Sequence, residues 1–115
     1  MANKPFAKFI TTFKGTLPCA DCPGIVTEIK LNSHTVTYEK KDVYMVRNDT
    51  LKVTGSYNTE RGYKKDKNAT IFILDDDKPG SEKRFLKLND NTLLMLGSDG
   101  EIIDTTSKFK LYKVK

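Results

Sequence analysis

Short runs in which apolar and polar residues alternate recur along the whole chain, separated by turn-forming residues about every eight to twelve positions. In the run Ile25–Leu31, one side of the chain carries Ile25, Thr27, Ile29 and Leu31, and the other carries Val26, Glu28 and Lys30. A period of two is typical of a β-strand that buries one face. No window of about twelve residues carries the 3.6-residue apolar stripe of a helix. The alternation therefore predicts an all-β protein.

The pattern predicts about eight short strands, with Gly15 ending the first and Gly55 marking a bulge or a sharp barrel bend. Phe109 and Leu111 are expected on one face of the last strand. The candidate runs, of which Val43–Val46 is ambiguous, are Phe6–Lys14, Ile25–Leu31, Thr35–Glu39, Val43–Val46, Leu51–Tyr57, Ala69–Leu74, Arg84–Leu88, Thr92–Leu96, Glu101–Ile103 and Lys108–Val114. A closed antiparallel barrel is favoured over an open arrangement, which would leave long unpaired edges. The length predicts a single domain over residues 1–115.

The net charge of +5 raises the question of a polyanionic partner. The densest basic stretch, Arg61–Lys67, is interrupted by Asp66 and falls between strands, so a solvated loop is expected and no nucleic-acid partner. The acidic run Asp75–Asp77 lacks the ligand spacing of a calcium-binding loop and is interpreted as a polar hairpin tip. No apolar run approaches the roughly eighteen residues of a transmembrane helix.

The sequence offers little for catalysis. The only histidine, His34, falls in an expected tight turn, and no serine or cysteine is placed by the sequence to use it as a base. Most carboxylates fall in turns or on outward strand positions. No catalytic residue is assigned, and a protein that is not an enzyme is expected.

Both cysteines of the chain lie in one short segment, where Cys19 and Cys22 form a CxxC pair. In a thioredoxin-type site the pair opens a helix that stabilises a thiolate, but here a strand pattern follows at Ile25. Three roles are open: a small disulfide contributing about 2 kcal/mol, a Cu(I) site, and a redox dithiol. Two thiolates suit Cu(I) better than Zn²⁺, which requires four ligands.

The string from Gly15 to Cys22, followed by Gly24 and Ile25, resembles the N-terminal domain of the NlpE family. Weaker similarity follows at Gly55–Tyr57, at Ile71–Leu74 and from Leu94 to Ile102. The family consists of envelope lipoproteins linked to copper tolerance and surface stress. The resemblance implies a lipocalin-like barrel, held at the outer membrane by a lipidated N-terminal cysteine, facing the periplasm or the cell surface.

The resemblance further implies that Cys19 and Cys22 are the copper ligands or the redox-responsive pair, with copper as the one cofactor considered. It leaves open an envelope protein partner and implies no role for Met45, Met95 or His34. The sequence contains no lipidated cysteine at its start, so membrane contact is expected only through an anchor outside this sequence.

Two departures from the family pattern bear on function. Pro23 follows the second cysteine and restricts the connecting loop, and the second domain of longer members is missing. Two other classes remain open. One is a ligand-binding barrel whose interior holds a small apolar molecule, with the CxxC pair only a structural disulfide. The other is a thiol–disulfide enzyme.

Overall fold

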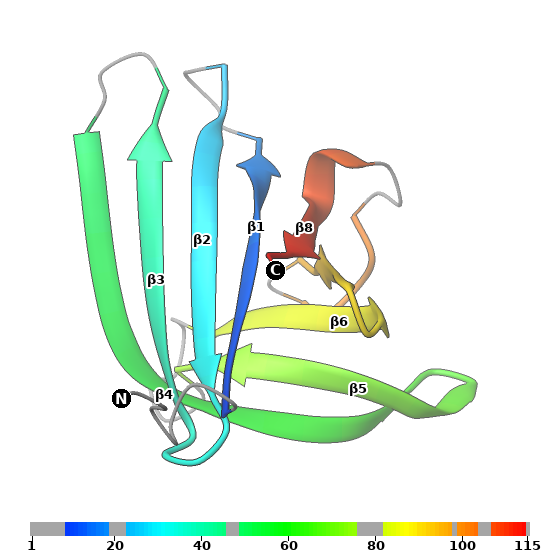
Figure 1. Cartoon of the computed structure of the whole chain (residues 1–115). Coiled ribbons are helices and arrows are strands. Elements are labelled where there is room, and N and C mark those ends of the chain that lie inside the picture. Colours follow the sequence, from blue (N-terminus) through cyan, green and yellow to red (C-terminus); the bar gives the residue numbers. More distant parts are fainter. Residues whose placement is uncertain are drawn as a thin grey trace.

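The computed structural model describes residues 9–18, 23–45, 49–75, 82–97, 99–103 and 107–114. Within these residues the chain forms a closed antiparallel barrel in which eight strands pair in sequence order and β8 closes onto β1 (Figure 1). The strands are β1 (Ile10–Leu17), β2 (Ile25–Asn32), β3 (Thr37–Tyr44), β4 (Asp49–Tyr63), β5 (Asp66–Leu74), β6 (Lys83–Asn89), β7 (Thr92–Met95) and β8 (Lys110–Lys113). The prediction of a small antiparallel barrel is confirmed.

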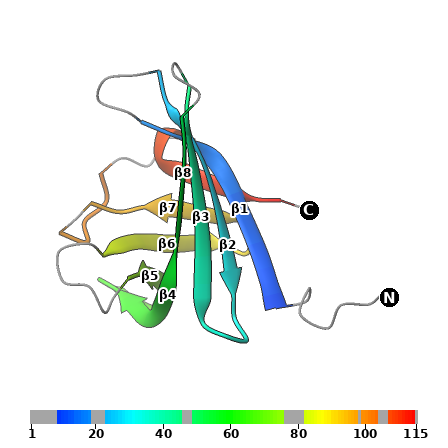
Figure 2. The same ribbon diagram turned by 90° about the vertical axis from the view of Figure 1, so that its left-hand side faces the viewer.

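The barrel is built from two layers whose strands cross steeply. Strands β1 to β3 run together with the first part of β4, whereas β5 and β6 run across them (Figure 1), and Figure 2 shows the first layer edge-on. Strand β4 belongs to both layers because it pairs with β3 as far as Ser56 and with β5 from Tyr57 onward. Such a crossing lets one strand form a corner between two sheets.

Gly55 lies at this corner, next to the change of partner. A Cβ atom there would overlap the Asp75 carboxylate and approach the Tyr38 ring to 2.9 Å. The Tyr38 hydroxyl donates a hydrogen bond to Asp75 Oδ2 at 2.7 Å. Strand β4 curves between the two layers (Figure 1), and its change of partner between Ser56 and Tyr57 sets this corner next to Gly55, as predicted. Asp75 is buried rather than part of a polar hairpin tip, which corrects that interpretation, and residues 76–77 lie outside the described residues.

The interior is filled by alternate side chains from all the strands. Partly buried Val53, Phe72 and Met95 pack against a buried cluster. The buried members are Phe13, Leu17, Ile29, Leu31, Tyr38, Tyr57, Leu74, Phe85, Leu93 and Leu111. A barrel of eight strands has an interior that side chains can fill, with room for at most one small ligand.

A second apolar cluster lies on the outer face of β5 to β7. Its buried members are Ala69, Ile71, Ile73, Leu86, Leu94 and Leu96. Tyr63 packs against this cluster and donates a hydrogen bond to the Gly100 carbonyl at 3.1 Å. Lys64 pairs with Glu101, and this hydrogen bond raises the pKa of Lys64. The segment around Gly100 is thereby fixed against the β4–β5 hairpin.

Phe109 also packs against the outer cluster, whereas Leu111 belongs to the interior. The prediction that these two residues share one face is wrong. Phe109 ends a 3₁₀ turn, η2 (Ser107–Phe109), and the strand alternation begins only at Lys110. A 3₁₀ turn has a period of three rather than two.

Several expected strand boundaries also differ. Most of the basic stretch Arg61–Lys67 lies in β4 and β5 rather than in a loop, and Glu101–Ile103 forms only an isolated bridge between Ile102 and Leu96. Strand β1 continues through Gly15 to Leu17, because the missing Cβ of Gly15 leaves room for the Lys110 carbonyl of β8. Strand β3 begins later than expected, since Val36 lies in the preceding turn with φ at 56°. It then runs without a break to Tyr44.

The corner makes a testable prediction. Gly55→Ala is expected to lower the free energy of unfolding by about 1–3 kcal/mol, because the added methyl group would displace Asp75 or Tyr38. Urea unfolding measures the change. Thr54→Ala, on the exposed neighbouring position, is the control and is expected to stay within about 0.5 kcal/mol. Equal stability of Gly55→Ala and Thr54→Ala would show that the corner is not tightly packed.

Candidate functional site

The two ends of the barrel differ in chemistry. We call the end formed by Leu17, Ile25, Tyr44 and Asp49 the cysteine end, because the connection 18–24 leaves from it (Figure 1). The opposite end carries the β2–β3 turn at residues 33–36, and we call the opening beside it the mouth. The predicted site residues belong to the first end.

Cys19 and Cys22 themselves lie outside the described residues, so their oxidation state and metal binding stay predictions. The structure does describe the residues on both sides of the pair. Leu17 pairs with Ile25 as the last pair between β1 and β2, and such pairs bring Cα atoms to about 5 Å. Because β2 begins at Ile25, the prediction that a strand follows the cysteine pair is confirmed.

Met45 reaches the cysteine end from β3. Its backbone N–H donates a hydrogen bond to the Gly24 carbonyl at 3.2 Å. A Cβ atom on Gly24 would lie only 3.3 Å from Met45 Sδ, so the thioether lies against the glycine two positions after Cys22. Met45 is 47% exposed, whereas Met95 packs against the core.

His34 lies in the turn at the mouth, at the opposite end of β2 from the cysteine end. Its ring lies 5.0 Å from that of Phe9, and the residue is exposed. The expectation of a surface histidine in a turn is confirmed. Across the described parts of the chain, no three or more histidine, cysteine, aspartate or glutamate residues gather closely enough to hold a metal ion.

A cavity of about 310 Å³ borders the cysteine connection. Thr16, Leu17, Pro18, Pro23 and Lys108 line it. Lys108 comes from η2, near the other end of the chain, and the sequence around the cysteines gave no indication of it.

A buried polar cluster lies inside the barrel, near the cysteine end. Thr27 Oγ1 donates a hydrogen bond to Asp42 Oδ1 at 2.7 Å, and Lys40 Nζ lies 3.1 Å from Asp42 Oδ2. Thr27 and Asp42 are buried, and they face each other across β2 and β3. This cluster was not predicted, because most carboxylates were expected on outward positions. Tyr38, Lys40 and Asp42 are every second residue of β3 and therefore share its inward face.

The mouth opens into a second cavity, of about 260 Å³. Its walls combine aromatic and aliphatic side chains with a few polar groups at the rim, and its lining includes Phe13, Leu31, Tyr57, Phe72 and Lys87. The sequence analysis left the ligand-binding residues of the barrel unassigned.

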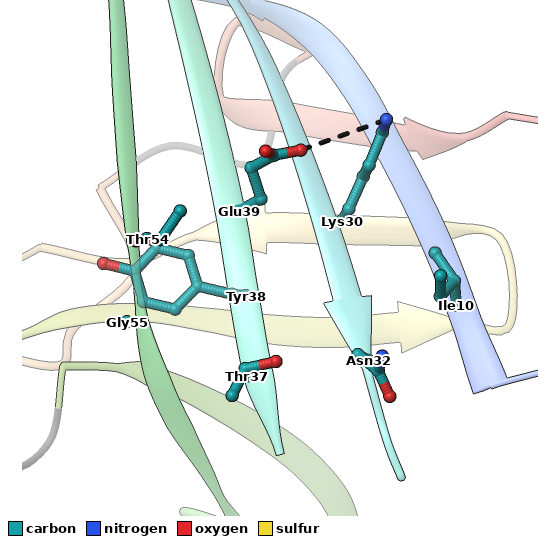
Figure 3. A pocket seen from close by; sticks show the side chains of 8 residues that line it. All are labelled: Ile10, Lys30, Asn32, Thr37, Tyr38, Glu39, Thr54 and Gly55. Carbon is teal, nitrogen blue, oxygen red and sulfur yellow. Dashed lines mark ion pairs between the residues drawn. The ribbon is translucent and has the colours of Figure 1, made fainter. Parts of the chain in front are cut away.

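A third cavity, of about 520 Å³, is a groove on the outer face of β1 to β4 (Figure 3). The exposed side chains around it include Thr37, Thr54 and the weak ion pair of Lys30 with Glu39, whose charged atoms lie 4.0 Å apart. Ile10 and the Tyr38 ring are apolar groups along the groove (Figure 3). The groove is open to solvent along its length, whereas a small-molecule site encloses most of its ligand, so the more enclosed mouth is the stronger candidate for a small molecule.

Comparison with known proteins agrees with this architecture. A "putative lipoprotein" from Shewanella oneidensis, solved by crystallography, has the same fold, with a TM-score of 0.66 and 24% sequence identity. The match covers 100% of this chain and 98% of the other. A search among curated proteins found no match. Over the described residues, no helix is long and apolar enough to cross a membrane.

The fold and its two ends define a small up-and-down β-barrel with a cysteine-bearing connection at one end and a lined cavity at the other. The sequence profile of the NlpE N-terminal domain matches residues 13–106. The chain belongs to the NlpE N-terminal domain family, which makes it an envelope-lipoprotein barrel, and the resemblance carried by residues 15–25 is confirmed.

The buried polar cluster makes a second prediction. Thr27→Val is expected to lower the free energy of unfolding by about 1–3 kcal/mol, because it removes a donor from the buried Asp42 carboxylate. Chemical denaturation of the purified domain measures the change. Thr54→Val, on the exposed outer face, is the matched control. A loss no larger than that of the control would mean that the hydrogen bond contributes nothing to stability.

Proposed function

We propose that the protein is a non-enzymatic cell-envelope domain in which Cys19 and Cys22 respond to copper and to redox conditions. The observation that carries the proposal is the position of the pair in a connection whose ends are fixed by the Leu17–Ile25 pairing and by the Met45–Gly24 hydrogen bond. A connection anchored on both sides limits how far the two thiols can separate.

The chemistry of the pair gives two exclusive states. The reduced pair supplies two soft thiolates, the ligand type that selects Cu(I). The oxidised pair has given up two electrons and two protons to an external thiol oxidant and no longer offers thiolates to a metal. An oxidising envelope favours the disulfide, whereas a reducing shift, or Cu(I) bound by the two thiolates, favours the reduced pair.

The neighbours of the connection support the reduced, metal-binding state. Lys108 lines the adjoining cavity and favours deprotonation of a nearby thiol by its charge. Met45 brings a thioether, a second type of soft ligand, to the same end. We therefore assign Met45 as the third Cu(I) ligand beside Cys19 and Cys22.

The family supports the cellular setting of the proposal. Copper tolerance and envelope-stress sensing fit an outer-membrane lipoprotein, held by an N-terminal lipid anchor and facing the periplasm or the surface. A change of state at the cysteine end would alter the surface that an envelope partner protein contacts. Thiol–disulfide catalysis is the less favoured role, because the strand at Ile25 replaces the helix that activates a catalytic thiol.

Copper titration tests the site. After its free thiols have been counted without reductant, the protein is reduced and titrated with Cu(I) against a competing chelator. The reduced protein is expected to bind one Cu(I), and Cys19→Ser combined with Cys22→Ser to weaken binding by more than about a hundredfold, beyond the loss typical of an outer-shell change. Affinity should rise with pH, because the thiols lose protons on binding. Unchanged uptake by the double variant would exclude the copper site.

Met45 is tested separately. Met45→Leu is expected to weaken Cu(I) binding by about tenfold without changing the thiol count, because a ligand is lost while the cysteines remain. Met95→Leu is the matched control, since Met95 packs against the core. If both leucine variants bind Cu(I) as the unmodified chain does, Met45 is not a ligand.

A further inference from the structure

The mouth of the barrel is lined by inward-facing side chains from several strands. Phe13 and Leu31 line it from β1 and β2, and Tyr57 and Phe72 line it from the second layer. The rings of Tyr57 and Phe72 meet edge to face, with their centroids 5.9 Å apart. These four side chains form an apolar floor beneath the opening.

Closer to the rim, the same inward positions become polar and basic. Thr11 lies two residues before Phe13 on β1, and Lys113 of β8 pairs with Phe13 in register. Lys87, paired in register with Leu93, faces inward from β6. A cavity with an apolar floor and a basic rim matches an amphiphile that has a chain at one end and an anionic group at the other.

The charges at the rim leave an excess of one cation. Lys87 Nζ lies 3.4 Å from Asp90 Oδ1, but the Asp90 side chain is 90% exposed and lines the outer edge. Among the described residues, Lys113 has no carboxylate partner. An ion pair as exposed as that of Lys87 with Asp90 is weak. The ammonium groups of Lys87 and Lys113 are therefore both able to bind an incoming anion.

Tyr57 adds a polar group at the floor. The residue is 8% exposed and lines the cavity, and its hydroxyl makes no hydrogen bond within the part of the chain that the structure describes. Burial raises the pKa of Tyr57, so the hydroxyl keeps its proton at neutral pH and is able to donate it. The hydroxyl borders the cavity and is able to donate a hydrogen bond to a bound ligand.

We propose that the mouth is a binding site for a single-chain anionic amphiphile, such as a medium-chain fatty acid, with its chain on the Phe13–Phe72 floor and its head group between Lys87 and Lys113. The volume of about 260 Å³ lies below the range of about 300–1,000 Å³ typical of sites for drug-sized ligands. The cavity therefore selects one short chain and excludes a whole diacyl lipid. This site lies at the opposite end from the cysteines and does not depend on copper or on redox state.

Calorimetric titration with decanoate tests the proposal, with the neutral decanol and the cationic decylamine as matched probes below their micellar concentrations. Decanoate is expected to bind one per chain and more tightly than either probe, and its affinity should fall with added salt. Lys87→Gln combined with Lys113→Gln is expected to weaken decanoate binding about tenfold while leaving decanol unchanged. The control, Lys30→Gln combined with Lys52→Gln, removes the same charge from the outer face.

A second variant fills the mouth and leaves the four floor residues unchanged. Thr11→Phe places a ring at an inward position of the mouth and is expected to abolish binding of both decanoate and decanol, while thermal unfolding shows that the barrel persists. The proposal is overturned if decanoate fails to bind, if decylamine binds equally well, or if the mouth and outer-face lysine variants behave alike. Nuclear magnetic resonance shifts confined to the groove around Thr37 and Thr54 would also overturn it.

Discussion

The corner in β4 is the constraint on which the rest of the barrel depends. At Gly55 the strand leaves β3 and turns toward β5, and the Tyr38–Asp75 hydrogen bond ties the two layers together at that point. Without a side chain at Gly55, the Asp75 carboxylate lies directly against the strand. If the strand could not bend here, the second layer could not cross the first, and β8 would not reach β1.

The closure that follows brings together residues that are far apart in the sequence. Pairing of β8 with β1 brings Lys113 into register with Phe13 at the mouth, and η2, just before β8, brings Lys108 to the cysteine connection. Both ends of the barrel therefore combine residues from the start and the finish of the chain. The proposed copper site lies at the cysteine end, and the proposed amphiphile site lies at the mouth.

The strands could be predicted because one-sided burial leaves a period of two in the sequence. The β6–β7 hairpin and the bend at Gly55 were visible for this reason and because turn residues punctuate the chain. The inward positions of Lys40 and Asp42 were not predicted. A buried face is recognised in a sequence by its apolar residues, and here the residues on that face are polar. Phe109 was misplaced because a 3₁₀ turn interrupts the alternation. The contributions of Met45 and Lys108 depend on long-range pairing, which no local pattern records.

The direction of β1 has a consequence for how the domain would be presented in the envelope. Its first residue, Ile10, lies at the same end as the β2–β3 turn, and the strand runs from there toward the cysteine connection (Figure 1). In the proposed lipoprotein, a lipid attached ahead of β1 would place the mouth nearer to the bilayer than the cysteine end. The proposed amphiphile site would then face the membrane, and the proposed copper site would face away from it.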